Sequence, residues 1–167
     1  MGRRISEKEF IRAYDELADD IFRFCAFQVR DRERARDLMQ DAFMRTWVYI
    51  EGGNEIDNLK AFLYKTARNL SINEAVRSKA RSLEELQETV GYDPADDTLE
   101  TPENLAEASI LLRHLSALPE DAQEVLTLRY MNGLAVKEIG EILGAAPNTV
   151  SVRIHRALEE LRKRMHA

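Results

Sequence analysis

A pair of amphipathic helix patterns near the C-terminus, separated by one glycine, constrains this chain more than any other stretch. Over residues 135–143 the apolar residues recur at three-and-four spacing, which is typical of one buried helix face: Val136, Ile139, Ile142 and Leu143. Gly144 can take the left-handed conformation that ends a helix, and Pro147 suits the first turn of the next one. The stretch therefore predicts a helix-turn-helix.

The second helix of this hairpin is longer and basic. Its buried face is predicted from the same spacing: Val150, Ile154, Ala157, Leu158 and Leu161. Its outward face carries groups that can bond base edges and phosphates from a major groove: Asn148, Thr149, Ser151, Val152, Arg153, His155 and Arg156. Helical hairpins also occur in ordinary bundles, and Ala146 at the N-cap offers no side-chain oxygen. Taken alone, the hairpin fits both a DNA-binding and a purely structural interpretation.

Length and composition limit the remaining possibilities. The chain has 167 residues, enough for one domain or two small ones. No apolar run approaches the roughly 18 residues of a membrane span, and no apolar core follows the N-terminal arginines as in a secretory signal. Cys25 is the only cysteine, and it is predicted to pack in a core. We therefore expect a cytoplasmic protein without a disulfide, metal site or cofactor.

The charge is unevenly distributed. The net charge is −6, but residues 82–107 hold nine acidic side chains and no basic one, so the remainder carries +3. Attraction to phosphate depends on local patches and not on the sum. The acidic total therefore does not exclude a nucleic-acid partner.

The first half predicts three helices. The first begins at the capping box of Ser6 and Glu9 and ends near Arg30. Its apolar residues are expected to face inward, and Ile11 is expected to widen that apolar face. Asp31 is expected to cap a second helix that runs to Gly52. Between its apolar positions, this second helix has a mixed and exposed face: Asp37, Gln40, Asp41, Met44 and Arg45.

The third helix is predicted from Asp57, as its cap, to about Lys79. Its outer side is expected to combine basic residues, two amides and an aromatic ring: Lys60, Lys65, Arg68, Asn69, Asn73, Tyr64, Arg77, Lys79 and Arg81, with Glu74 as the only acid. Charge for the backbone, amides for base edges and flat rings for stacking are what single-stranded DNA needs. A solvated charged face is the alternative.

The second half predicts an all-α arrangement as well. A helix over roughly residues 104–117 is followed by one that starts at Pro119 or Glu120, ends at Asn132–Gly133, and has Tyr130 among its core residues. The stretch before them contains Gly91, Pro94 and Pro102 and few apolar residues, so a linker is predicted there. The expected architecture is two small helical domains, 5–81 and 104–167, joined by an acidic linker over 82–103.

The combination resembles a known family. The order of DLMQDAFMRTW, FLYKTARNLSIN, an acidic linker, LPEDAQEVLTLRYMNGLAVKEIGEILG and NTVSVRIHRALEELR is similar to that of bacterial extracytoplasmic-function (ECF) sigma factors. The resemblance implies a region 2 that binds the β′ coiled coil of core RNA polymerase and melts the minus-ten element. It also implies a region 4 that binds the β flap and reads the minus-thirty-five element. An anti-sigma factor is a further implied partner.

Site residues follow from the resemblance position by position. The mixed face from Asp37 to Arg45 matches the polymerase-binding surface, and the outward residues Asn148 to Arg156 match the minus-thirty-five contacts. Capture of a flipped minus-ten base is assigned to the GGNEID loop and the helix after it: Asn54, Lys65, Arg68, Asn69 and Asn73.

Two other functions fit parts of the sequence. A sigma mimic would keep the two domains to sequester an anti-sigma factor without binding DNA. Such a protein is expected to lose its DNA-binding residues, but Asn69, Asn73 and Arg153 are present in this chain. A stand-alone helix-turn-helix regulator would leave the N-terminal domain unexplained. An enzyme is not expected, because the three histidines are scattered and no carboxylate pair or nucleophile stands beside a base.

Overall fold

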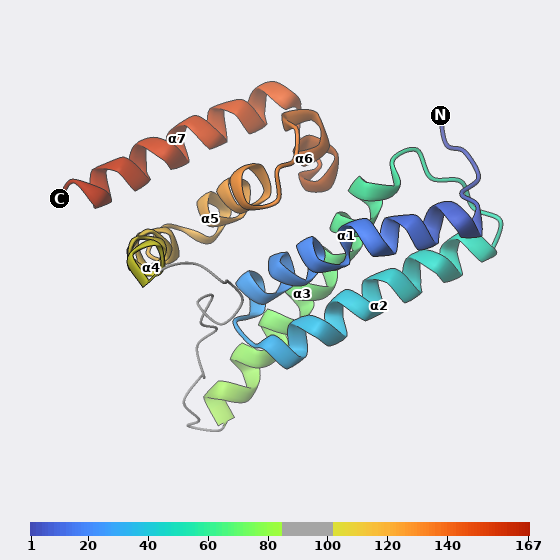
Figure 1. Cartoon of the computed structure of the whole chain (residues 1–167), viewed down its shortest axis with the longest axis horizontal. Helices are drawn as coiled ribbons and strands as arrows, with labels where there is room; N and C mark the ends of the chain where they lie inside the picture. Colours follow the sequence, from blue (N-terminus) through green and yellow to red (C-terminus); the bar gives the residue numbers. More distant parts are fainter. Residues whose placement is uncertain (85–101) are drawn as a thin grey trace. The chain divides into compact units, whose positions relative to one another are not determined.

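The computed structural model describes residues 1–84 and 102–167, and the chain divides into two compact units, Met1–Tyr92 and Asp93–Ala167. The described part of the first unit consists of α1 (Glu7–Val29), α2 (Arg32–Glu51) and α3 (Leu59–Glu84). The described part of the second consists of α4 (Pro102–Ser116), α5 (Glu120–Leu126), the π-helical turn η2 (Thr127–Met131), α6 (Val136–Leu143) and α7 (Pro147–Met165). Figure 1 shows these elements. The predicted all-α architecture with two small helical domains is confirmed.

In the first unit, each of the three helices packs against the other two. Two of them begin as predicted. The Ser6 hydroxyl accepts a hydrogen bond from the Glu9 N–H at 3.2 Å, and the Asp31 carboxylate accepts one from the Arg34 N–H at 3.1 Å. Such caps satisfy N–H groups that have no partner within the helix. The most deeply buried side chains include Ile21, Phe24, Cys25, Ala42 and Leu63.

Two boundary predictions for this unit were wrong, and so was one core assignment. Asn58, and not Asp57, caps α3, because its side-chain oxygen accepts a hydrogen bond from the Ala61 N–H at 3.0 Å. The helix also continues past Lys79 to Glu84. Ile11 is 52% exposed, since a residue directly after Phe10 is turned about 100° away from it around the helix.

Tyr64 was also predicted wrongly. It is completely buried and its ring packs edge-on against Phe24, with 5.8 Å between the ring centroids. It lies one turn from the buried Ala61 and Ala67, so it belongs to the core stripe of α3. The ring is therefore not on the outer side of α3, where stacking on DNA was expected.

Glu74 is the acid that the sequence placed on the outer basic side of α3. It is buried instead, with its carboxylate bound by the Nε and Nη2 atoms of Arg34 at 2.8 and 2.7 Å. This bidentate pair joins α2 to α3. The hydrogen bonds from Arg34 lower the pKa of the Glu74 carboxyl, and burial opposes them.

Replacing Glu74 with glutamine should therefore destabilise the first unit in a pH-dependent way. Because the folded-state pKa is lowered, the stabilisation is present above the unfolded pKa and is lost as the pH falls through the folded value. Arg34 is partly solvated, so we expect a loss of about 1–2 kcal/mol at pH 7. Urea unfolding at several pH values should show the gap between wild type and Glu74→Gln closing below about pH 4. Glu51→Gln, at an exposed position of α2, is the control, and a gap that is the same at all pH values would contradict the role of the ion pair.

In the second unit, α4 and α5 pack on α7, and α6 packs on α7 and η2. Tyr130 was predicted to be in the core but is 60% exposed. The chain there is wound as a π-helical turn, closed by the Asn132 N–H donating to the Thr127 carbonyl at 3.0 Å. The wider turn changes the register of the side chains, so Tyr130 points outward while Leu128 stays buried.

Candidate nucleic-acid interface

The helix-turn-helix has the predicted local geometry. Gly144 ends α6 in the left-handed conformation, at φ 66°, and Pro147 is the first residue of α7. The Ala145 N–H donates to the Gly140 carbonyl at 2.9 Å, which closes the turn. A Cβ atom on Gly140 would lie 2.6 Å from the Ala145 carbonyl oxygen, so only glycine fits at this crossing. Ala146 caps α7 without a side-chain hydrogen bond, as expected.

The outer face of α7 is presented to solvent as predicted. Val150, Ile154 and Ala157 are buried, and this fixes which side of the helix faces outward. All the residues assigned to DNA on this helix are exposed: Asn148, Thr149, Ser151, Val152, Arg153, His155 and Arg156. The Nε2 atom of His155 lies 3.4 Å from the Oε1 atom of Glu159, which is one turn later on α7. The helix therefore offers hydroxyl, amide, imidazole and guanidinium groups on one side.

The mixed face of α2 is also on the surface. Asp37, Gln40, Met44 and Arg45 are exposed, whereas Asp41 is half-buried and accepts hydrogen bonds from Arg45 at 3.2 Å to each carboxylate oxygen. Next to them, Val48 is 62% exposed and extends the apolar part formed by Met44 at 66%. Val48 was not among the predicted site residues, although its position one turn after Met44 places it on the same face.

The outer face of α3 is more mixed than the sequence predicted. Lys65, Asn69 and Asn73 are exposed at one-turn intervals, and Arg68 is half-buried. Ile72 and Val76 are exposed beside them, at 40% and 63%. The predicted basic residues Lys65, Arg77, Lys79 and Arg81 are all exposed. The outer side of α3 thus combines cations and amides with apolar contact area, but the aromatic ring of Tyr64 is not part of it.

The loop between α2 and α3 is shaped by its own contacts. Gly53 has a positive φ of 84°, which favours glycine. The Asn54 side-chain amide donates one hydrogen bond to the Tyr49 carbonyl at 2.9 Å, which ties the loop to the last turn of α2. Arg3 pairs with Ile56 through the backbone.

An aromatic pair that was not predicted from the sequence flanks this loop. The rings of Tyr49 and Phe62 lie 4.9 Å apart at an angle of 30°, and Tyr49 is 40% exposed. Both residues lie within four positions of the loop ends, and this proximity in sequence could have identified them. The pair provides a flat aromatic surface next to Asn54. The buried Tyr64 cannot provide such a surface.

Metal-ligating side chains do not cluster in the part of the chain that the structure describes. Within it, no group of three His, Cys, Asp or Glu side chains could hold a metal ion. Cys25 is buried, and burial raises the pKa of its thiol to about 11. Across the same residues, no helix combines the length and the apolar content needed to cross a bilayer.

Comparison with known proteins decides the family. The sequence model described as Sigma-70 region 2 matches residues 13–82, and that described as Sigma-70, region 4 matches residues 108–161. The ECF RNA polymerase sigma factor SigW of Bacillus subtilis is 30% identical over 168 residues, which cover 93% of this chain and 88% of SigW. The chain belongs to the ECF RNA polymerase sigma factors. The expected family is therefore confirmed, and membership of it supports a sigma factor role in transcription initiation.

Other matches agree with this assignment. The ECF RNA polymerase sigma factor SigL of Mycobacterium tuberculosis is 27% identical over 163 residues, covering 96% of this sigma factor and 92% of SigL. A similar solved fold is the sigma factor RpoE in complex with the anti-sigma factor NepR from Bartonella quintana. Its TM-score is 0.71 at 22% identity, with coverage of 96% of this chain and 98% of that one.

Proposed function

We propose that this sigma factor binds core RNA polymerase in the cytoplasm and directs it to promoters by reading the minus-thirty-five element and melting the minus-ten element. In this proposal residues 5–81 form region 2, 82–103 the linker and 104–167 region 4. The observation that carries the proposal is that each unit of a sigma-family chain exposes a polar helix face suited to nucleic acid. These faces are the α3 face with Asn69 and Asn73 and the α7 face with Arg153 and Arg156.

Melting is assigned to the α2–α3 loop and to α3. A base turned out of the stack would meet the Asn54 side chain and the exposed Tyr49 ring, while Lys65 and Arg68 neutralise backbone phosphates. Asn69 and Asn73 supply amides that can pair with base edges. Extruding a base costs a few kcal/mol of stacking and pairing. Opening therefore succeeds only at sequences whose extruded base gains that much in the site.

Recognition of the minus-thirty-five element is assigned to α7 lying in the major groove. Replacing Arg153 with alanine should weaken promoter binding by about 1–3 kcal/mol if its guanidinium reads a base, and the loss should be confined to promoters that carry that base. Binding of the polymerase complex to a set of minus-thirty-five variants measures this. A loss that is equal across all variants would make Arg153 a phosphate contact; Arg162→Ala, near the end of the same helix, is the comparison.

Polymerase binding is assigned to the α2 face of Asp37, Gln40, Asp41, Met44 and Arg45 for the β′ coiled coil, and to region 4 for the β flap. A small interface with an apolar centre and a charged rim suits such docking. Two weak contacts on one chain reinforce each other, because the second binding step becomes intramolecular. Since the related RpoE fold was solved with the anti-sigma factor NepR, we include an anti-sigma protein among the partners of this chain.

Run-off transcription tests the proposal as a whole. The protein is added to sigma-free core polymerase with a library of bacterial promoters, and we expect initiation at a specific subset. Core alone is the negative control. Core binding without initiation at any promoter would overturn the proposal in favour of a sigma mimic. Tight binding to duplex DNA without core would overturn it in favour of a stand-alone regulator.

A further inference from the structure

The N-terminal segment, residues 2–5, lies against the loop between α2 and α3, as Figure 1 shows. The Arg3 N–H donates to the Ile56 carbonyl at 3.1 Å, and the Ile56 N–H donates to the Arg3 carbonyl at 3.0 Å. A Cβ atom on Gly2 would lie 2.8 Å from the Cβ atom of Glu55, so the two backbones are in close contact. The segment is thus paired with the centre of the loop.

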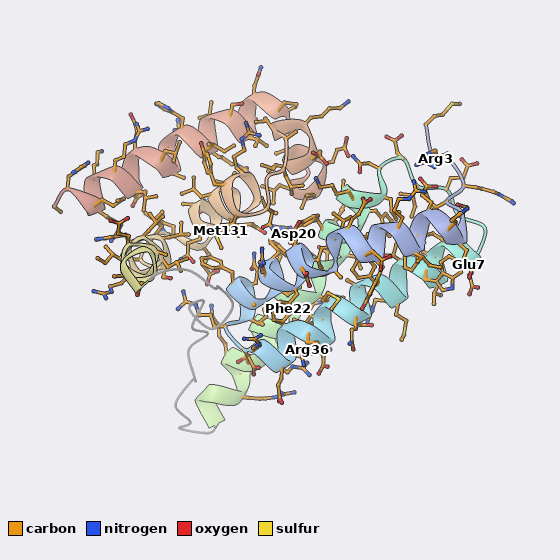
Figure 2. All side chains as sticks on the ribbon, viewed as in Figure 1. Arg3, Glu7, Asp20, Phe22, Arg36 and Met131 are labelled. Carbon is orange, nitrogen blue, oxygen red and sulfur yellow. The ribbon has the colours of Figure 1, made fainter. Side chains whose placement is uncertain are left out.

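The same segment is fixed to the body of the first unit. Ile5 is buried at 6% exposure, and Ile56 at 3%. The Arg3 guanidinium forms a bidentate ion pair with Glu9 in the first turn of α1, and Figure 2 shows Arg3 at the end of the unit where α1 begins. Ser6 caps that helix. An exposed ion pair contributes little by itself, so the backbone pairing and the two buried isoleucines are what hold the segment and the loop together.

We propose that the N-terminal segment is a positioning element that holds the loop of residues 52–58 in the shape needed to capture a base, and so contributes to the minus-ten preference. This inference rests on the proposed function of the loop. The loop contains two adjacent glycines, and ordering such a backbone upon binding would cost conformational entropy. The loop is instead held from two sides before DNA arrives: Asn54 is bound to α2 through the Tyr49 carbonyl, and Ile56 is bound to Arg3. A site ordered in advance discriminates better, because less binding energy is spent on ordering it.

The substitution Arg3→Pro tests this, because proline has no N–H to donate to Ile56. Two matched variants separate the possible causes. Arg3→Ala keeps the backbone pairing and removes the contact with Glu9, whereas Arg4→Pro makes the same chemical change one residue later, at an N–H that takes no part in the pairing. Each full-length variant is measured in two ways: hydrogen exchange of the Ile56 amide in the free protein, and promoter opening with core polymerase. Opening is compared between a preferred minus-ten sequence and single-base variants of it.

For Arg3→Pro we expect the Ile56 amide to exchange about tenfold faster or more. We also expect the ratio of opening between preferred and altered sequences to fall by about threefold or more, with the melting temperature of the protein unchanged. Arg3→Ala and Arg4→Pro should keep both values near those of the wild type.

Unchanged exchange at Ile56 in Arg3→Pro would overturn the inference, and so would faster exchange with an unchanged opening ratio. These results differ from a failure of the proposed function. If the proposed function is wrong, the wild-type protein itself will open no promoter, and the segment can then have no role in base preference. The exchange measurement would still show whether the segment holds the loop.

Discussion

Replacing Asn69 and Asn73 together with alanine should abolish open-complex formation while leaving binding to core polymerase intact. Both side chains are exposed on α3 and stand one turn apart, so neither supports the core of the first unit. A bidentate amide–base contact contributes about 1–3 kcal/mol to discrimination. Losing two of them would lower the open fraction by roughly 30-fold or more. Permanganate reactivity of minus-ten thymines, with core polymerase bound, measures this fraction directly.

The matched control is Ser78→Ala, an exposed polar position further along the same helix. Alanine favours a helix more than asparagine or serine does, so both variants should fold at least as well as the wild type. Thermal unfolding and core-binding titrations should confirm this. If thymine reactivity in the double variant equals that of the wild type, the two asparagines do not read the melted strand.

Much of this architecture could be predicted because it is encoded locally. The cap at Ser6, the cap at Asp31, and the glycine and proline around the helix-turn-helix each act within one helical turn. Apolar spacing also placed the buried face of α7 correctly, and with it the exposed positions on the other side. The exposure of the candidate site residues follows from this same periodicity.

The errors arose where neighbouring positions compete. Asp57 and Asn58 are both good capping residues, and only the path of the chain decides that Asn58 is used. Tyr64 has a polar hydroxyl and was therefore placed outside, but it lies one turn from the buried Ala61 and Ala67 and packs against Phe24 on α1. A π-helical turn has no clear sequence pattern, so the register change that exposes Tyr130 was not predictable.

Contacts between distant parts of the chain could not be predicted either. The pairing of Arg3 with Ile56 and that of Arg34 with Glu74 each join segments at least 40 residues apart. Nothing in the spacing of one helix indicates which charged residue of another will reach it. These contacts nevertheless determine the shape of the α2–α3 loop and remove an acid from the outer face of α3.

Replacing Gly140 with alanine should disrupt the helix-turn-helix. Gly140 is buried in the middle of α6, and an added Cβ would overlap the Ala145 carbonyl oxygen at 2.6 Å. That oxygen belongs to the backbone of the turn, so it cannot move aside as a flexible side chain could. Alanine gains about 1 kcal/mol in helix propensity over glycine. We expect the steric cost to exceed this gain and to leave a net destabilisation of about 2 kcal/mol.

The functional effect should be larger than this loss of stability suggests. The turn after Gly140 sets the angle between α6 and α7, and a shift there would displace Arg153 and Arg156 from the groove together. Initiation at promoters that depend on the minus-thirty-five element should fall by roughly tenfold or more, whereas core binding through α2 should be retained. The control is Glu141→Ala, an exposed neighbour on the same helix. If Gly140→Ala equals Glu141→Ala both in its stability to urea and in its transcription activity, the turn accommodates a methyl group. In that case the close approach of Gly140 and Ala145 would not determine how α7 meets DNA.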